Sequence, residues 1–187
     1  MYNWFNEQRL PTLKTDGEGD QLRFSTVDQE VVVHLKKYDI VQVVCTAKGT
    51  TTVLDTPVKK LVVGEGNTTR DVFHYLTPGG PAPTLRLGIT KHQGIGSWSS
   101  LPHPFELHPE PGFEEAFFYL LEGASQRAIQ VGKGVWFDST NVDGIWHVRD
   151  RGWCTIPMGY HPVVGEPGVK VSYVWAYLAK HSHWEKV

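Results

Sequence analysis

Six side chains of the types that bind divalent metal ions gather in two parts of this sequence. Five lie close together and one follows later in the chain: His103, His108, Glu110, Glu114, Glu115 and His161. Imidazole nitrogens and carboxylate oxygens together suit one divalent ion. Three ligands from the first part and one from the second would leave open positions for a substrate. The pattern therefore predicts a metal centre between two strand edges.

The adjacent carboxylates Glu114 and Glu115 must point to opposite faces if the segment around them is a strand. The run FEEAFFYLL from 113 to 121 is rich in aromatic residues and bounded by Gly112 and Gly123, which favours a strand over a helix. One of the two carboxylates then faces an apolar interior, where it is costly unless it is paired or bound to a metal. The sequence therefore indicates that the inward carboxylate has a function, but it does not identify that function.

His161 lies in a stiff segment, PMGYHP. Pro157 and Pro162 restrict the backbone on both sides, and Gly159 permits a close approach of another segment. A hydrogen-bonded core histidine is the alternative interpretation of this position. The presence of the first cluster favours a metal ligand instead.

The elements that must position these side chains are short strands. Alternating and β-branched runs, separated by glycine and proline turns, recur from residue 22 to residue 179, and no stretch has helical periodicity with caps. This pattern predicts an all-β barrel or jelly roll. We interpret residues 1–22 as a loosely held arm and turn, and residues 127–138 as a hairpin around Gly132-Lys133-Gly134.

Composition excludes several classes of partner. The chain has 187 residues, 40% of them hydrophobic and 20% charged, and a formal net charge of -2. It carries no basic field for nucleic acid or an anionic membrane, and no apolar run near the roughly 20 residues of a spanning helix. We expect no secretion signal, because residues 1–14 lack the basic-then-apolar order of one. We expect Cys45 and Cys154 to be buried free thiols, and the protein to be cytoplasmic.

Three segments carry a resemblance to a known family: WSSLPH from 98 to 103, EEAFFY from 114 to 119, and PMGYHPV from 157 to 163. Residues 64–72 (GEGNTTRDV), 167–168 and 172–174 extend the match to roughly residues 60–179. Together they resemble the cupin isomerases of deoxy-uronates, the KduI/IolB-type family of 5-deoxy-glucuronate and 5-keto-4-deoxyuronate isomerases.

The resemblance implies a cupin, that is, a double-stranded β-helix or jelly-roll barrel, with one divalent metal ion held by three histidines and one glutamate. Zinc or manganese is the expected metal, with iron or nickel as alternatives. By motif, His103 is the first histidine, Glu115 the carboxylate and His161 the last histidine. The family's His-x-His pattern is absent after His103. His108 could supply the missing ligand, or could itself be the first ligand, with Glu110 as the second.

The family also implies a metal-dependent aldose–ketose isomerase acting on a sugar acid of the deoxy-uronate type. One alternative is a non-enzymatic, sugar-binding or structural cupin with a degraded metal site, which the missing His-x-His favours. Another is a different metal-cupin enzyme, such as a dioxygenase. Under the isomerase interpretation, we expect the base to be Glu114, Glu110 or Tyr160, and the substrate to be bound by Arg70, Arg127 and Tyr119, with Arg86 as a further candidate for the carboxylate.

Family members usually carry two cupin halves, and this chain is too short for both. We therefore expect residues 1–58 to form an N-terminal arm and strand extension that could be a remnant of a first half. Residues 59–180 would form the cupin domain, and residues 181–187 a tail. The expected partners are a small sugar acid and, by analogy with other cupins, a second copy of the chain, with no nucleic acid or membrane.

Overall fold

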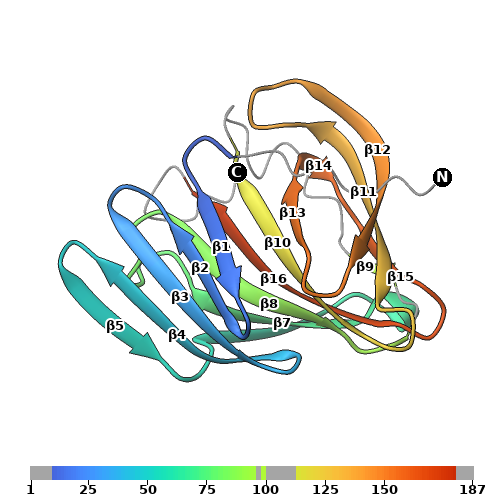
Figure 1. The fold of residues 1–187 in the computed structure, drawn as a ribbon, viewed down its shortest axis with the longest axis horizontal. Coiled ribbons are helices and arrows are strands. Elements are labelled where there is room, and N and C mark those ends of the chain that lie inside the picture. Colours follow the sequence, from blue (N-terminus) through green and yellow to red (C-terminus); the bar gives the residue numbers. More distant parts are fainter. Residues whose placement is uncertain (1–9, 96–97, 100–112, 180–187) are drawn as a thin grey trace.

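Three antiparallel sheets, stacked in layers, make up the molecule (Figure 1). The structure, a computed structural model, describes residues 10–95, 98–99 and 113–179. Within these ranges the one helical element is a single turn of 3-10 helix, η1 (Gly66–Thr68), and the other elements are strands. The all-β prediction is confirmed.

The N-terminal sheet is a simple meander in which each strand pairs with the next in the chain. Its inner face carries residues such as Phe24, Val33 and Val43, which are fully buried. This sheet is the N-terminal strand extension that the sequence predicted. Its strands are β1 (Lys14–Glu18), β2 (Gln21–Ser25), β3 (Gln29–Lys36), β4 (Asp39–Ala47) and β5 (Thr50–Leu54).

The N-terminal hairpin corrects one prediction, because β1 begins at Lys14, inside the segment expected to be a loose arm. All but one of the side chains of β1 are exposed, so this edge strand lacks the apolar alternation by which strands are found in a sequence. Its pairing with β2 aligns Thr15 with Phe24, and Gly19 makes the turn with a φ of 60°. The apolar side chains that anchor the hairpin all lie on its second strand.

The middle sheet is the framework of the fold, because both of its faces are covered. Leu85, Leu87 and Leu120 pack against the N-terminal sheet in one core cluster. The alternate residues, such as Phe117 and Tyr173, pack on the other side in a second cluster. In spatial order the strands are β13 (Trp153–Ile156), β10 (Glu115–Glu122), β16 (Lys170–Leu178), β8 (Leu85–His92), β7 (Arg70–Leu76) and β6 (Lys59–Val63).

The third sheet covers the second core cluster and completes the barrel (Figure 1). Ala128, Val148 and Val163 of this sheet are buried in that cluster. Its main path is β12 (Asn141–Arg149), β11 (Arg127–Val135), β15 (Val163–Gly165) and β9 (Trp98–Ser99), and β14 (Met158–Tyr160) also pairs with β11.

The predicted hairpin around Gly132 and Gly134 is wrong, because β11 runs straight through both glycines. The turn comes later, where the Trp136 amide donates to the carbonyl of Thr140 at 2.9 Å. A Cβ on Gly132 would lie 2.5 Å from the ring of Trp146, and one on Gly134 would collide with the carbonyl of Met158. These glycines make room for neighbouring strands and do not reverse the chain.

Two further observations bear on the expected environment of the protein. Cys45 and Cys154 are both buried thiols that form no disulfide, as predicted. No helix in the described ranges has the length and apolar character needed to cross a membrane.

Candidate metal centre

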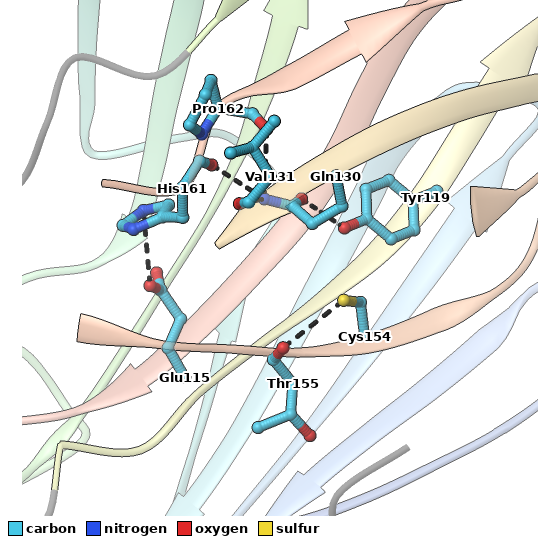
Figure 2. Close-up of polar contacts among 8 residues, drawn as sticks. All are labelled: Glu115, Tyr119, Gln130, Val131, Cys154, Thr155, His161 and Pro162. Carbon is cyan, nitrogen blue, oxygen red and sulfur yellow. Dashed lines mark hydrogen bonds and ion pairs between the residues drawn. The ribbon is translucent and has the colours of Figure 1, made fainter. Parts of the chain in front are cut away.

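Glu115 and His161 approach each other in the space between the middle and third sheets (Figure 2). Glu115 is the first residue of β10, and His161 lies in the short connection from β14 to β15. The two residues are only 6% and 1% exposed, and His161 Nε2 lies 3.8 Å from Glu115 Oε2. The fold therefore brings together two of the four predicted ligands from segments that are distant in the chain.

The surroundings of Glu115 disfavour an isolated charge. Burial raises the pKa of its carboxyl group from 4.5 to about 8. Its neighbours are largely aromatic: the ring of Phe117, two residues along β10, lies edge-on to His161 with centroids 6.0 Å apart. A carboxylate kept in such an interior needs a positive partner to stay ionised.

The donor set fits a divalent metal ion. A carboxylate oxygen and an imidazole nitrogen each bind zinc at about 2.0–2.2 Å, which sets two ligand atoms on the order of 3.4 Å apart in a tetrahedral site. The observed separation of 3.8 Å is close to that value. Among the described residues no group of three or more His, Cys, Asp or Glu side chains converges, so this part of the chain offers two ligands.

A buried hydrogen-bond network fixes the backbone at His161 (Figure 2). The side-chain amide of Gln130, on β11, donates to the carbonyl oxygens of His161 and Pro162 at 2.8 and 3.2 Å. The Tyr119 hydroxyl, on β10, donates to Gln130 Oε1 at 2.6 Å. Gln130 thus ties the strand that carries Glu115 to the segment that carries His161. These bonds are made to main-chain oxygens, so they hold the backbone from which the His161 imidazole extends.

Gly159 shows why this segment can approach β11 so closely. Its φ is 114°, and an added Cβ would lie 2.6 Å from the carbonyl oxygen of Lys133. Any other residue would push β14 away from β11 and displace His161. The close approach predicted for Gly159 is confirmed.

The structure does not place Glu114 in this site. Its carboxylate accepts hydrogen bonds from the backbone amides of Thr12 and Leu13, at 2.9 and 2.7 Å. These partners lie in the N-terminal segment, which borders the other face of the middle sheet. Alternation along the strand sends Glu115 inward and Glu114 away from it. Glu114 therefore anchors the N-terminal segment, which corrects its prediction as a catalytic base.

The two arginines chosen for the substrate carboxylate also lie apart from Glu115. Arg127, at the start of β11, is partly exposed and pairs with Glu166 at 3.1 Å, on the face opposite buried Ala128 and Gln130. Arg70 is buried on β7 and donates to the Thr68 carbonyl at 2.9 Å. The strand register aligns Glu115 with Tyr177 of β16, and Tyr177 with Arg86 of β8. Arg70 aligns instead with His92, which lies six residues farther along β8. Six residues of strand span roughly 20 Å.

Of the remaining predicted residues, the structure describes Tyr119 and Tyr160. Tyr119 acts through Gln130, as described, and burial raises the pKa of its hydroxyl well above the usual value. Tyr160 is half-buried and aligns with the exposed Lys133 in the pairing of β14 with β11, a register that favours the outer face. His103, His108 and Glu110 lie outside the described residues.

Gln130 is the residue that sequence reasoning missed. It is fully buried within β11. An isolated polar residue at an inward position of the alternating run RAIQV was the available signal.

A barrel of two facing antiparallel sheets that encloses a buried carboxylate and imidazole has the architecture of a cupin. The chain belongs to the KduI/IolB family, whose model matches residues 20–187, so the family resemblance found in the sequence is confirmed and extends upstream into the N-terminal sheet.

Two curated relatives are named 5-deoxy-glucuronate isomerase. The protein from Halalkalibacterium halodurans is 30% identical over 118 residues, which cover 62% of this chain and 42% of the relative. The protein from Bacillus subtilis (strain 168) is 29% identical over 114 residues, which cover 59% of this chain and 41% of the relative. The matched region thus spans about two fifths of the length of these relatives.

A solved structure supports the fold over nearly the whole chain. An IolB-like protein from Salmonella typhimurium LT2 superposes with a TM-score of 0.59 at 18% identity, covering 93% of this chain and 73% of that one. At this identity the similarity speaks for the cupin architecture and for the extension that precedes it.

Proposed function

We propose that this protein is a metal-dependent isomerase that interconverts the aldose and ketose forms of a sugar acid of the deoxy-uronate type. The observation that carries the proposal is the buried Glu115–His161 pair, 3.8 Å apart, inside a cupin of the KduI/IolB family. The names of the curated relatives supply the substrate class.

Glu115 and His161 would hold the metal ion. His103 and His108, or Glu110 in place of one of them, are the proposed further ligands, and zinc or manganese is the proposed metal, with iron or nickel as alternatives. When bound, the ion would polarise a carbonyl group and stabilise negative charge that develops on oxygen. Glu115 must lose its proton to bind, so metal binding and deprotonation of this carboxyl group are coupled.

The protein's own contribution is orientation and exclusion of water. Gln130 and Tyr119 fix the direction of His161, and the aromatic lining of the second core cluster keeps the interior dry. The reaction needs a base that moves a proton between adjacent carbon atoms. With Glu114 held by the N-terminal segment and Tyr160 in a register that favours the outer face, Glu110 remains the proposed candidate for this base.

The proposed setting is cytoplasmic, where the buried thiols of Cys45 and Cys154 would stay reduced. The proposed partners are a small sugar acid and a second copy of the chain. We propose no role in binding nucleic acid or membranes. The boundary between residues 58 and 59, and the origin of the N-terminal sheet as a remnant of a first cupin half, stay predictions.

The test is turnover of 5-deoxy-glucuronate, and of related deoxy-uronates, by protein supplied in turn with zinc, manganese, iron and nickel. We expect isomerisation that disappears in the variant His161→Ala. Sugar binding without turnover would favour the non-enzymatic cupin. Oxygen consumption that depends on iron would favour the dioxygenase alternative.

A further inference from the structure

A cavity of about 480 Å³ opens between the N-terminal and middle sheets, at the end of the stack where β3 turns into β4. Four of the residues that line it are lysines. Lys36 and Lys37 come from the end of β3 and the turn after it, Lys91 comes from β8, and Lys170 comes from β16. Both sheets thus contribute ammonium groups to one cavity, in a chain whose formal net charge is -2.

The strand register turns the middle-sheet side chains toward this cavity. Ser172 of β16 is aligned with Lys91 of β8. Two residues farther along these strands, Val174 and Ile89 are buried in the core cluster that the middle sheet shares with the N-terminal sheet. Because side chains alternate along a strand, Lys91, Ser172 and Lys170 all face the N-terminal sheet.

Positive charge exceeds negative charge in the lining. Asp39 and Glu122 are the two carboxylates beside the four lysines, and Lys91 Nζ lies 2.6 Å from Asp39 Oδ2. The ammonium groups of Lys36, Lys37 and Lys170 form no ion pair with a residue that the structure describes. Four lysines against two carboxylates leave a net charge of +2 around the cavity. A concave surface with one dominant sign of charge attracts ligands of the opposite sign.

Ser172 is an independent sign of a binding site. Its side chain lies on the cavity wall and is only 3% exposed. Within the described part of the chain its hydroxyl group makes no hydrogen bond. A buried polar group usually has a partner, and a hydroxyl can donate to an anion. A ligand oxygen in the cavity would supply that partner.

The turn that forms the opposite wall is fixed before any ligand binds. The guanidinium group of Arg151 donates to the Lys37 carbonyl at 3.0 Å and to Asp20 at 2.9 Å. The ring of Tyr38 packs against the shared core cluster and also lines the cavity. Val41, which is 44% exposed, adds a second apolar surface next to the lysines.

We propose that this cavity binds a phosphoryl group, either free or carried by a small metabolite. Lysines bind phosphate as compact point charges, whereas the planar fork of arginine suits a carboxylate. Lys36, Lys37 and Lys170 contact the phosphoryl oxygens, and Ser172 donates a hydrogen bond to one of them. The body of a phosphorylated metabolite lies along Tyr38 and Val41.

This site is separate from the candidate metal centre. Glu115 and Glu122 lie at opposite ends of β10, seven residues or roughly 23 Å apart. Their side chains face opposite sides of the middle sheet, because Glu115 lies in the space toward the third sheet and Glu122 lines the cavity toward the N-terminal sheet. The proposal therefore goes beyond the proposed isomerase function and does not depend on it.

The test is calorimetric titration of the purified protein with inorganic phosphate, glucose 6-phosphate and glucose at constant ionic strength. We expect both phosphates to bind and glucose not to bind. Lys170→Gln should weaken phosphate binding about 3- to 10-fold, and the double variant Lys36→Gln/Lys170→Gln should weaken it further. Asp39→Asn should strengthen it about 3- to 10-fold, because this change removes a negative charge and releases Lys91.

Matched controls separate the site from the general charge of the protein. Lys60→Gln removes a lysine of β6 that pairs with Asp71 at 3.3 Å, outside the cavity. It should keep the wild-type affinity for phosphate, and so should His161→Ala. Tighter binding of glucose 6-phosphate than of phosphate would identify a phosphorylated metabolite as the ligand, and equal affinities would identify free phosphate. Either result supports the site.

The proposal is overturned if neither phosphate binds at millimolar concentration. It is also overturned if the double variant binds phosphate as tightly as Lys60→Gln does, or if Asp39→Asn weakens binding. Failure of the isomerase function gives a different pattern, in which phosphate binding follows the lysines as expected while deoxy-uronates are not turned over with any metal.

Discussion

Gln130 offers the sharpest test of how the site is built, because one fully buried side chain links both sides of it. We consider the variant Gln130→Leu, which keeps the approximate volume and removes every polar contact. The carbonyls of His161 and Pro162 lose an amide donor, and the Tyr119 hydroxyl loses its acceptor. The amide of Val131 still donates to the Pro162 carbonyl at 2.9 Å. The loss of hydrogen bonding therefore falls mainly on the His161 carbonyl and the Tyr119 hydroxyl.

The expected loss of stability follows from the hydrogen bonds that these two groups lose. Leaving a buried polar group without its partner costs about 1–3 kcal/mol, so the free energy of unfolding should fall by roughly 2–5 kcal/mol. Loss of a direct partner of a metal-binding side chain typically weakens metal binding about 10- to 100-fold. Gln130 holds the main chain of His161, so we expect a loss toward the lower end of that range. Both effects should appear in the same variant.

The assay is urea unfolding of the metal-free protein together with competitive titration of Zn²⁺. Gln29→Leu is the matched control, since Gln29 is also a buried strand glutamine, bonded to Thr84 and Leu85 in the other core cluster. It should lose stability without changing metal affinity. If Gln130→Leu binds Zn²⁺ as tightly as Gln29→Leu, the positioning role of Gln130 is refuted.

Three other predictions follow from individual contacts. In the metal-free protein the raised pKa of Glu115, about 8, means that its contribution to stability is complete below pH 4.5 and is lost as the pH rises toward 8. The free energy of unfolding should then fall by up to about 1.4 kcal/mol per pH unit, and urea unfolding of Glu115→Gln should show a flatter profile. Glu114→Ala should lower stability by about 1–3 kcal/mol because the amides of Thr12 and Leu13 lose their acceptor, with metal content unchanged; loss of the metal would contradict its anchoring role. Gly88→Ala should be destabilised by at least about 1–3 kcal/mol in thermal unfolding, because its Cβ would lie 2.3 Å from the ring of Trp175, and a wild-type melting temperature would show that the packing is looser.

Much of the fold could be predicted from the sequence, because the strands of the middle sheet have strong patterns. Aromatic content and bounding glycines favoured a strand for the run from 113 to 121. Its residues after Glu115 are all apolar because both faces of β10 are buried, in two different core clusters. The turn that presents His161 could also be recognised from local residues, since two prolines restrict its backbone and Gly159 permits a close approach.

The rest depended on partners that are distant in the chain. Gly132 and Gly134 resemble a turn in the sequence, and only Trp146 and Met158 show that they provide space inside a strand. Alternation alone could not decide which of Glu114 and Glu115 faces the site, because both are buried.

The most direct test of the central claim is elemental analysis of the untagged protein, wild type beside Glu115→Gln and His161→Ala. The claim is that these two side chains hold one divalent ion inside the barrel. We predict close to one equivalent of zinc, manganese, iron or nickel per chain in the wild-type protein, and its loss in both variants that still fold. A wild-type protein without metal even after supplementation, or variants that keep a full equivalent, would contradict the account.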